Sequence, residues 1–261
     1  MHPETHPAEG AYDAFAPFYD DFIAFCDYEA WTASVEPVIR GHAPGRRLLD
    51  LACGTGESTV PFLRRGYDVA GCDVSEAMLS AARLKAPSLR FHRADLRELP
   101  LLGRYDVLTC FGDCLNYLAS ADELAAAFRS ARRNLAPGGV LAFDVNTLAA
   151  YRSTFASDRV TDGEGATFIW RGRGSGDAPP GCAAEATIDV LRPAADDGYS
   201  LIRTHHRHRH HPPETVAELL RLAGLTSVEV LGVRADGSLA PEPDEETLLK
   251  TFHVARFEER R

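Results

Sequence analysis

Short apolar runs alternate with stretches of helical periodicity between residues 46 and 147. The apolar runs have the length of buried strands, and they are RRLLDLAC, YDVAGCDV, LRFHRADL, YDVLTCFG and VLAFDVN. Helical patterns follow the first two runs, where Ser75 is a candidate N-cap, and another precedes the last run. Because such alternation is typical of a parallel sheet covered on both faces, the pattern predicts an α/β fold.

The pattern changes after the fifth predicted strand. ATFIWRGRG, AEATIDVLRP and YSLIRTHHRHRHH are strand-like and follow one another without a helix, which predicts a small inserted antiparallel sheet. PPETVAELLRLAGL then predicts a helix, and SVEVLGV and LLKTFHVARFE predict two last strands. The predicted organisation is an N-terminal helical cap at 1–45, a core at 46–150, the inserted sheet at 151–212, and a C-terminal helix with the last two strands at 213–261.

Composition narrows the possible partners. The chain has 261 residues, of which 45% are hydrophobic, and its formal net charge is -10. No apolar run approaches the roughly 18 residues that span a bilayer, and the first ten residues lack a secretory pattern, so we expect a cytoplasmic protein without a membrane partner. The negative charge disfavours a nucleic-acid partner. No CxxC pair occurs among the six cysteines, so we expect reduced thiols and no metal site.

The stretch LLDLACGTGES, residues 48 to 58, ends in a glycine-rich bend directly after the first predicted strand. Ligands of open parallel sheets bind at that place, and Gly54 and Gly56 allow the backbone to approach one closely. A dinucleotide site would prefer a third glycine at position 59, where this chain has threonine.

Carboxylates close three of the predicted strands. Asp50 precedes the glycines, Asp73 ends the second strand nineteen positions after Gly54, and Asp95 ends the third. Asp73 can accept hydrogen bonds from both hydroxyls of a ribose, and Asp95 can accept one from an adenine amino group. Since neither contact needs a pyrophosphate, this set favours S-adenosylmethionine over NAD.

Taken together, LLDLACGTGES, YDVAGCDVSEAML, FHRADLRELP, YDVLTCFGDCLNYL and LAPGGVLAFDV resemble the ordered motifs of class I S-adenosylmethionine-dependent methyltransferases. The resemblance implies a Rossmann-like seven-stranded sheet whose last strand is antiparallel to the rest. It also implies S-adenosylmethionine as cofactor, S-adenosylhomocysteine as product, and no metal. The cofactor-binding residues that it implies are Tyr19, Trp31, Ala52, Gly54, Asp73, Val74, Met78, Asp95, Leu96 and Phe111.

Individual roles follow from the same resemblance. Gly54 would line the methionine part of the cofactor, Asp73 would hold the ribose, Asp95 and Leu96 would contact the adenine, and Met78 would pack on its ring. Ala52 departs from the family, in which many members have glycine at that position.

The segment AYDAFAPFYDDFIAFCDYEAW resembles the N-terminal helices of bacterial small-molecule methyltransferases, including glycine N-methyltransferase and sugar N,N-dimethyltransferases. In those relatives the segment closes over the cofactor. Tyr19, Tyr28 and Trp31 are the residues that the resemblance carries over. Ordinary aromatic packing of a helix on the sheet is the alternative interpretation.

Two residues after the fourth strand are candidates for the reaction itself. Tyr117 matches a position where related enzymes have histidine or tyrosine near the acceptor, and Asp113 could orient an amine. A helix cap or a core contact is the structural alternative for each.

The histidine-rich stretch 204–214 allows three interpretations: a metal site, a solvated basic strand, or a wall of the acceptor pocket. Alternation along a strand places His206, His208 and His210 on one face and His205, Arg207, Arg209 and His211 on the other. A strand of the form H-x-x-R resembles an active-site segment of these methyltransferases, which maps onto His206 and Arg209. His206 could then act as a base, and Arg209 could hold an anionic group of the acceptor.

The predicted function is transfer of a methyl group to a nitrogen or oxygen of a small molecule by in-line displacement, in specialised metabolism. Phe168, Trp170 and Ile188 could line the acceptor site or pack the small sheet. C-methylation of an electron-rich aromatic ring, a non-catalytic S-adenosylmethionine-binding module and a dinucleotide oxidoreductase are the alternatives. We expect a monomer or homodimer.

Overall fold

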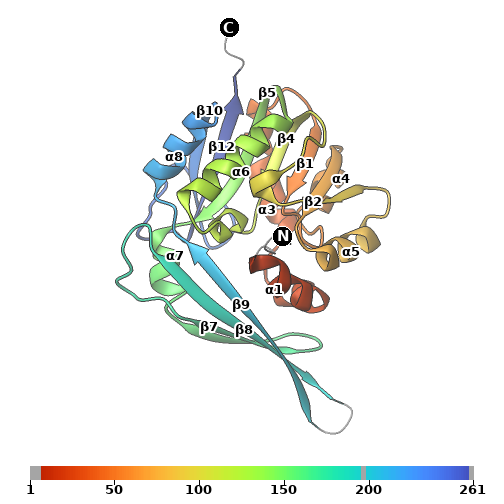
Figure 1. The fold of residues 1–261 in the computed structure, drawn as a ribbon, viewed down its shortest axis with the longest axis vertical. Coiled ribbons are helices and arrows are strands. Elements are labelled where there is room, and N and C mark those ends of the chain that lie inside the picture. The colour runs from red at the N-terminus through yellow and green to blue at the C-terminus, as the bar shows by residue number, and fades with distance from the viewer. Residues whose placement is uncertain (1–6, 195–197, 259–261) are drawn as a thin grey trace, which may run out of the picture.

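The computed structural model describes residues 7–194 and 198–258, which form two sheets with helices packed around them (Figure 1). The strands of the large sheet are β1 (Arg47–Leu51), β2 (Asp68–Asp73), β3 (Arg90–Arg93), β4 (Tyr105–Cys110), β5 (Leu135–Asn146), β10 (Leu225–Val233), β11 (Leu239–Ala240) and β12 (Lys250–Phe257). Those of the small sheet are β6 (Asp158–Asp162), β7 (Thr167–Gly172), β8 (Ala183–Pro193) and β9 (Tyr199–Arg209).

The large sheet has the strand order β11-β10-β12-β5-β4-β1-β2-β3. Strands β1 to β5 pair in parallel, and β12 inserts antiparallel between β5 and β10. The predicted Rossmann-like α/β fold and its antiparallel last strand are therefore confirmed. An eighth strand exceeds the seven expected, because the chain turns tightly at Gly237 and two residues of β11 pair back onto the end of β10.

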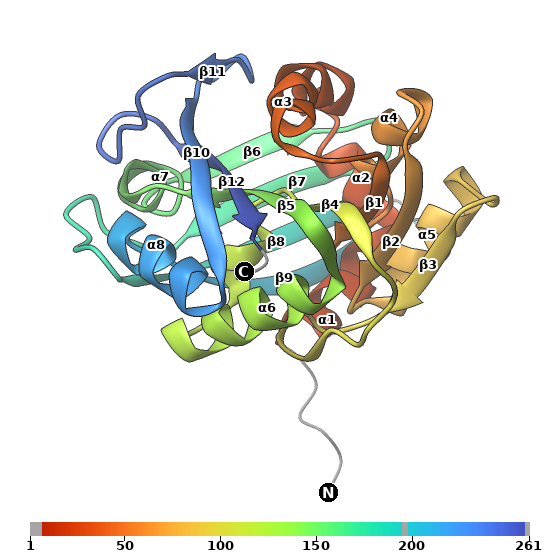
Figure 2. The ribbon, with the colours of Figure 1, turned by 90° about the horizontal axis from the view of Figure 1, so that it is seen from above.

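Helices cover both faces of this sheet, and Figure 2 shows α3 and α4 on one face and α6 and α8 on the other. The α-helices are α1 (Pro7–Phe15), α2 (Tyr19–Phe22), α3 (Tyr28–His42), α4 (Thr59–Arg64), α5 (Glu76–Lys85), α6 (Ala121–Asn134), α7 (Leu148–Ser153) and α8 (Pro213–Leu222). Along β5, Val140 and Ala142 pack with α3 and α4, whereas Leu141 and Phe143 pack with α6 and α8. The two-residue period of a strand thus supplies two cores, one on each face.

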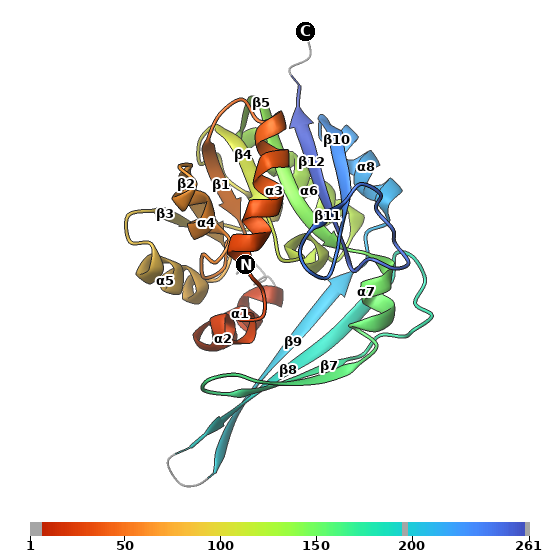
Figure 3. The same ribbon diagram turned by 180° about the vertical axis from the view of Figure 1, so that it is seen from behind.

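The small sheet is wholly antiparallel, with the order β6-β7-β8-β9, and its long β8–β9 hairpin projects from the body of the molecule (Figure 3). Three of its strands were predicted. The fourth, β6, has the polar sequence DRVTD and lies almost wholly exposed at the edge, so it carries no hydrophobic pattern from which to predict it.

Helix α1 lies between the two sheets and contacts β9 of the small sheet and α5 of the large domain (Figures 1 and 3). Its Phe15 packs with Phe168 and Ile188 of the small sheet. On its other side, Asp13 accepts a hydrogen bond of 2.5 Å from Ser75, the residue that also caps α5 through the backbone N–H of Met78. The N-terminal segment therefore joins the small sheet to the second βα unit of the large one.

Within residues 7–194 and 198–258, none of the helices combines the length and the apolar character that spanning a bilayer requires. The same residues contain no group of three or more histidine, cysteine or acidic side chains placed to hold a metal ion. The six cysteines are free thiols.

Candidate active site

The glycine-rich bend after β1 uses backbone conformations that favour glycine. Gly54 and Gly56 have φ angles of +54° and +87°, and a side chain on Gly54 would approach the ring of Tyr19. Ala52 also has a positive φ of 52°. An L-residue in this region costs about 1–2 kcal/mol, so the bend stores some strain at Ala52.

The carboxylate of Asp50 holds this bend in place through hydrogen bonds. The side chain is fully buried and accepts hydrogen bonds from the hydroxyls of Ser58, Thr59 and Thr109, at 2.6 to 2.7 Å. Burial raises the pKa of Asp50, and the three hydroxyls oppose that rise. Thr59 therefore has a structural task here, because its hydroxyl binds a buried carboxylate at the place where dinucleotide folds have a glycine.

Asp73 ends β2 beside the bend and is oriented by two backbone groups. One carboxylate oxygen accepts from the N–H of Gly54 and the other from the N–H of Ser75, each at 2.9 Å. Each oxygen keeps a second lone pair, so the carboxylate can still accept two hydroxyls of a ligand. Burial raises the pKa of Asp73 to about 6, and the backbone N–H groups work against this rise.

A cavity opens in front of the bend, and it encloses about 660 Å³ including its mouth. Eight of the ten residues expected at the cofactor line it, namely Tyr19, Ala52, Gly54, Asp73, Val74, Met78, Asp95 and Leu96. Trp31 and Phe111 do not: they pack edge-to-face on each other, and both contact Phe252 in the core under α3. Tyr12, Ala94, Cys114, Tyr117 and Leu118 also line the cavity.

A second cavity of about 1060 Å³, mouth included, lies between the N-terminal helices, the small sheet and the ends of β4, β5 and β12. It shares three lining residues with the first cavity: Tyr12, Tyr19 and Tyr117. Its other walls carry Asp113, Asn146, Lys250, His206 and His208, besides Trp170, Ile188 and further aromatic side chains. The two cavities therefore meet at a group of tyrosines.

A chain of hydrogen bonds runs along the boundary between the cavities. The hydroxyls of Tyr12 and Tyr117 are 2.8 Å apart, and that of Tyr117 is 2.8 Å from Nδ1 of His206. Nε2 of His206 is 2.8 Å from the hydroxyl of Thr204, which lies 3.4 Å from the carbonyl of Ile188. Every group is satisfied if Tyr12 donates to Tyr117, Tyr117 to His206, and His206 to Thr204. Burial lowers the pKa of His206 to about 3, so its ring is neutral near pH 7.

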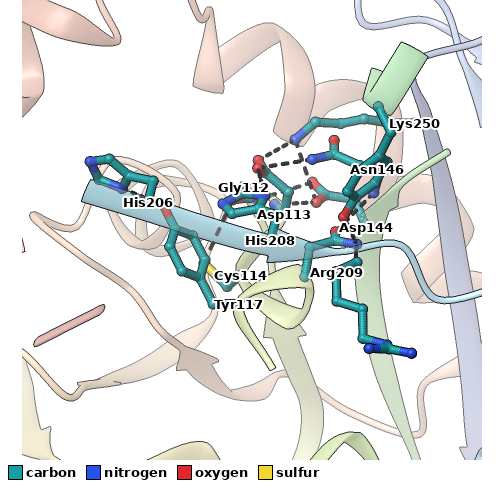
Figure 4. Close-up of polar contacts among 12 residues, drawn as sticks. Gly112, Asp113, Cys114, Tyr117, Asp144, Asn146, His206, His208, Arg209 and Lys250 are labelled. Carbon is teal, nitrogen blue, oxygen red and sulfur yellow. Dashed lines mark hydrogen bonds and ion pairs between the residues drawn. The ribbon is translucent and has the colours of Figure 1, made fainter. Parts of the chain in front are cut away.

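Asp113 and Lys250 form the centre of a partly buried charged group (Figure 4). Lys250 Nζ is 2.9 Å from Asp113 and 3.6 Å from Asp144, while Asn146 donates to Asp113 at 3.1 Å. Asp113 has a positive φ of 53°, which its backbone N–H bond of 2.6 Å to Asp144 supports. Burial would raise the pKa of Asp113, but Lys250 and His208 hold it below its usual value. The two carboxylates raise the pKa of Lys250 against the effect of burial.

The alternation predicted for the histidine-rich stretch is observed only within β9, where His206 and His208 are buried and His205 and Arg207 are exposed. The strand ends at Arg209, so alternation no longer applies beyond it, and His210 and His211 are both buried, contrary to the prediction that they lie on opposite faces. Arg209 points away from the charged group in Figure 4 and does not line the second cavity; its guanidinium donates to the carbonyl of Ala119 at 3.4 Å.

Sequence reasoning missed Tyr12, His208 and Lys250 as parts of these cavities, and Asp144 as part of the charged group. Asp144 and Lys250 sit on strands β5 and β12, which pair antiparallel, and Lys250 is the register partner of Asn146. Only that pairing brings them together. A charged residue within an otherwise apolar strand was the one signal in the sequence.

The fold and the site together define a class of protein. S-adenosylmethionine-dependent methyltransferases combine a Rossmann-like sheet with a glycine bend, a carboxylate placed to bind a ribose, and a capped cavity. Residues 48–139 match the family model described as a methyltransferase domain. A protein of Geobacillus sp. (strain WCH70), provisionally named a methyltransferase, is 30% identical over 259 residues, 94% of this chain and 99% of that one. The chain belongs to this methyltransferase family and uses S-adenosylmethionine as cofactor. The dinucleotide oxidoreductase interpretation is therefore excluded.

Two sugar-modifying proteins are also similar. The dTDP-3-amino-3,4,6-trideoxy-alpha-D-glucopyranose N,N-dimethyltransferase of Streptomyces venezuelae is 34% identical over 116 residues, and the alignment spans 44% of this chain and about half of the relative, 49%. The structure of the sugar N-methyltransferase KedS8 from Streptoalloteichus sp. ATCC 53650 superposes with a TM-score of 0.73 at 27% identity, over 94% of this chain and 93% of that one.

Proposed function

We propose that this methyltransferase acts on the amine nitrogen of a small-molecule acceptor bound in the second cavity. The observation that carries the proposal is the contact between the two cavities at Tyr12, Tyr19 and Tyr117. An acceptor in the second cavity would lie directly across these tyrosines from the cofactor. Such placement of two reactants is the main contribution that a protein makes to a displacement reaction.

The residues of the first cavity suit the cofactor. Gly54 leaves room for the chain of the cofactor, Asp73 has two lone pairs free for ribose hydroxyls, and Asp95 with Leu96 would hold the adenine beside Met78. When bound, S-adenosylmethionine supplies an electrophilic methyl group on a sulfonium. Trp31 and Phe111 would support this site only indirectly, through the core beneath the bend.

The charges beside Asp113 favour an amine. Asp113 lines the second cavity, Asp144 lies behind it and accepts from its backbone N–H, and Lys250 is the one ammonium group that contacts both carboxylates in the described part of the chain. With both carboxylates ionised, these three groups keep one negative charge, which would attract a protonated amine toward Asp113; Arg159, over the ring of Phe25, adds a cation elsewhere on the cavity wall.

The relatives point to a substrate class. The Streptomyces venezuelae protein and KedS8 are named for N-methylation of sugars, so we propose an amino sugar or a similarly small amine, made in specialised metabolism, as the acceptor. The cavity of about 1060 Å³ is large enough for a sugar with a substituent.

C-methylation of an electron-rich aromatic ring is a second candidate, favoured by the walls of the same cavity. Its aromatic side chains outnumber the charged ones, and they are Tyr12, Phe15, Tyr19, Phe22, Phe25, Tyr28, Tyr117, Phe155 and Trp170. Such walls suit stacking on an indole or phenol.

Radiolabelled S-adenosylmethionine tests both candidates. The purified protein would be incubated with the amino sugar nucleotide of the Streptomyces venezuelae relative, with small primary amines, and with indoles and phenols. Label on an amine nitrogen is the expected result. Label on ring carbon alone would replace the first candidate by the second, and no transfer to any acceptor, with S-adenosylhomocysteine bound, would overturn both.

A further inference from the structure

His206 and His208 lie two residues apart on the same face of β9, but their surroundings differ. Both ring nitrogens of His206 are engaged, one with Tyr117 and one with Thr204. Neither ring nitrogen of His208 has a hydrogen-bond partner among the residues that the structure describes, although its side chain is 97% buried. A buried polar group left without a partner destabilises the folded protein, so its presence calls for an explanation.

Packing holds the His208 ring in place beside the second cavity. The ring of Tyr117 crosses it edge-on with 4.1 Å between centroids, and Phe155 packs at 5.0 Å on another side. Nδ1 of His208 is 3.5 Å from a carboxylate oxygen of Asp113, too long for a good hydrogen bond but close enough to orient the ring. That contact leaves Nε2, itself fully buried, as the ring nitrogen with no polar neighbour among the described residues.

We propose that His208 is the residue that accepts the proton of the acceptor amine, with Asp113 as its orienting partner. The inference rests on the proposed amine function and deepens it. His206, whose nitrogens are already bound, instead positions the hydroxyl of Tyr117. Contacts of this kind are often long before the substrate binds and shorten in the complex, as expected here for the 3.5 Å separation.

The proton and electron balance is simple. An ammonium group entering the cavity transfers one proton to Nε2 of His208, and the N–H bond that breaks leaves its electron pair on the nitrogen. That electron pair forms the new bond to the methyl carbon. At the same time the carbon–sulfur bond of the cofactor breaks, and the electrons of that broken bond stay on sulfur. The imidazolium that forms is compensated by the negative charge that Asp113 and Asp144 hold in excess of Lys250.

The groups around His208 set its protonation. Asp113 and Tyr117 face it from the segment after β4, Lys250 from β12, and His206 from its own strand. Burial, the largest effect, lowers the pKa of His208 to about 4, and Asp113 opposes this. The free ring is therefore neutral near pH 7. Proton transfer to it is uphill, and the favourable methyl transfer that follows draws it forward.

The first test replaces His208 with glutamine and compares it with His205→Gln, the same change on the exposed face of the same strand. The amino sugar nucleotide of the Streptomyces venezuelae relative serves as acceptor. At pH 7 we expect His208→Gln to lose about 10²- to 10⁴-fold in kcat, with S-adenosylhomocysteine affinity and melting temperature kept, and His205→Gln to match the wild type. Above the pKa of the amine, the loss should shrink, because the acceptor arrives deprotonated.

A loss of the same size at every pH would assign His208 a structural role and overturn the proposal, as would an unchanged rate. The second readout needs no turnover, so it decides the inference even if the wild type methylates no amine and the proposed function fails. In protein with ¹⁵N-labelled histidine, bound to S-adenosylhomocysteine, His208 should carry its proton on Nδ1. Methylammonium chloride should then shift the Nε2 signal of His208 and leave His205 unchanged. A proton on Nε2, or no shift, would overturn the proposal.

Discussion

At the scale of single residues, Asp73 shows how a backbone prepares a ligand site. Two N–H groups orient its carboxylate and leave one lone pair on each oxygen. Asp73→Asn should therefore weaken binding of S-adenosylhomocysteine by roughly 1.5–3 kcal/mol for each lost charge-assisted hydrogen bond. Calorimetric titration measures this directly, and unchanged affinity would remove Asp73 from the ribose site.

The raised pKa of Asp73 also predicts a pH dependence. Burial raises this pKa to about 6, and a ribose hydroxyl prefers the ionised carboxylate as its acceptor. Affinity for S-adenosylhomocysteine should consequently fall as the pH drops through about 6, and binding near that pH should release protons. Titrations in buffers of different ionisation enthalpy count those protons. The Asp73→Asn variant should show neither effect.

Thr59 is a second residue whose task the structure explains. Its hydroxyl donates at 2.6 Å to Asp50, and both side chains are fully buried. Thr59→Val keeps the shape and deprives the carboxylate of a donor, so we expect a loss of about 1–3 kcal/mol in the free energy of unfolding. Thr59→Ser keeps the donor and is the matched control. Equal stabilities of the two variants in urea denaturation would show that the hydroxyl contributes nothing.

At the scale of elements, the small sheet depends on one buried carboxylate. Asp189 of β8 is 2% exposed and pairs with Arg171 of β7 and, at 2.5 and 2.8 Å, with Arg203 of β9. It thereby ties three neighbouring strands together. Because Arg203 is half exposed and can be solvated when unpaired, Asp189→Asn should cost only about 1–2 kcal/mol in unfolding free energy.

The same carboxylate predicts how stability changes in acid. Arg203 above all, and Arg171, hold the pKa of Asp189 at about 2, against an unfolded value near 3.8. A lowered pKa contributes stability that is fully present above the unfolded pKa, and this part is lost as the pH falls from about 4 to about 2. The difference in unfolding free energy between wild type and Asp189→Asn should narrow over that window; a constant difference would contradict the ion pair.

At the scale of the whole molecule, α1 connects the two sheets and covers the cofactor cavity. Tyr12 lines both cavities, and Asp13 binds Ser75 at the start of α5. Cofactor binding should therefore slow hydrogen exchange in α1, while α8, packed on α6 away from both cavities, should exchange at an unchanged rate. Mass spectrometry with and without S-adenosylhomocysteine measures both helices in one experiment, and unprotected α1 amides would show that the segment does not close on the cofactor.

The hydrophobic pattern and the residues at the strand ends were enough to predict the sheet and the cofactor bend. The reason is local: strands alternate in burial, glycines take positive φ, and carboxylates at strand ends meet at one edge of a parallel sheet. The sequence pattern alone therefore predicted that Gly54, Asp73 and Asp95 lie together at the cofactor site. The alternation along β9 likewise placed His206 and His208 on one face without showing which of them is satisfied.

The second cavity could not be predicted from the sequence, because it depends on contacts between distant segments. Asp113, Asp144 and Lys250 come from segments up to 137 residues apart, and their contact depends on β12 inserting antiparallel beside β5. The N-terminal helices and the small sheet add walls whose positions no periodicity encodes. The same contacts engage His206 and leave His208 unpartnered, since hydrogen bonding is set by neighbours in space and not by neighbours in sequence.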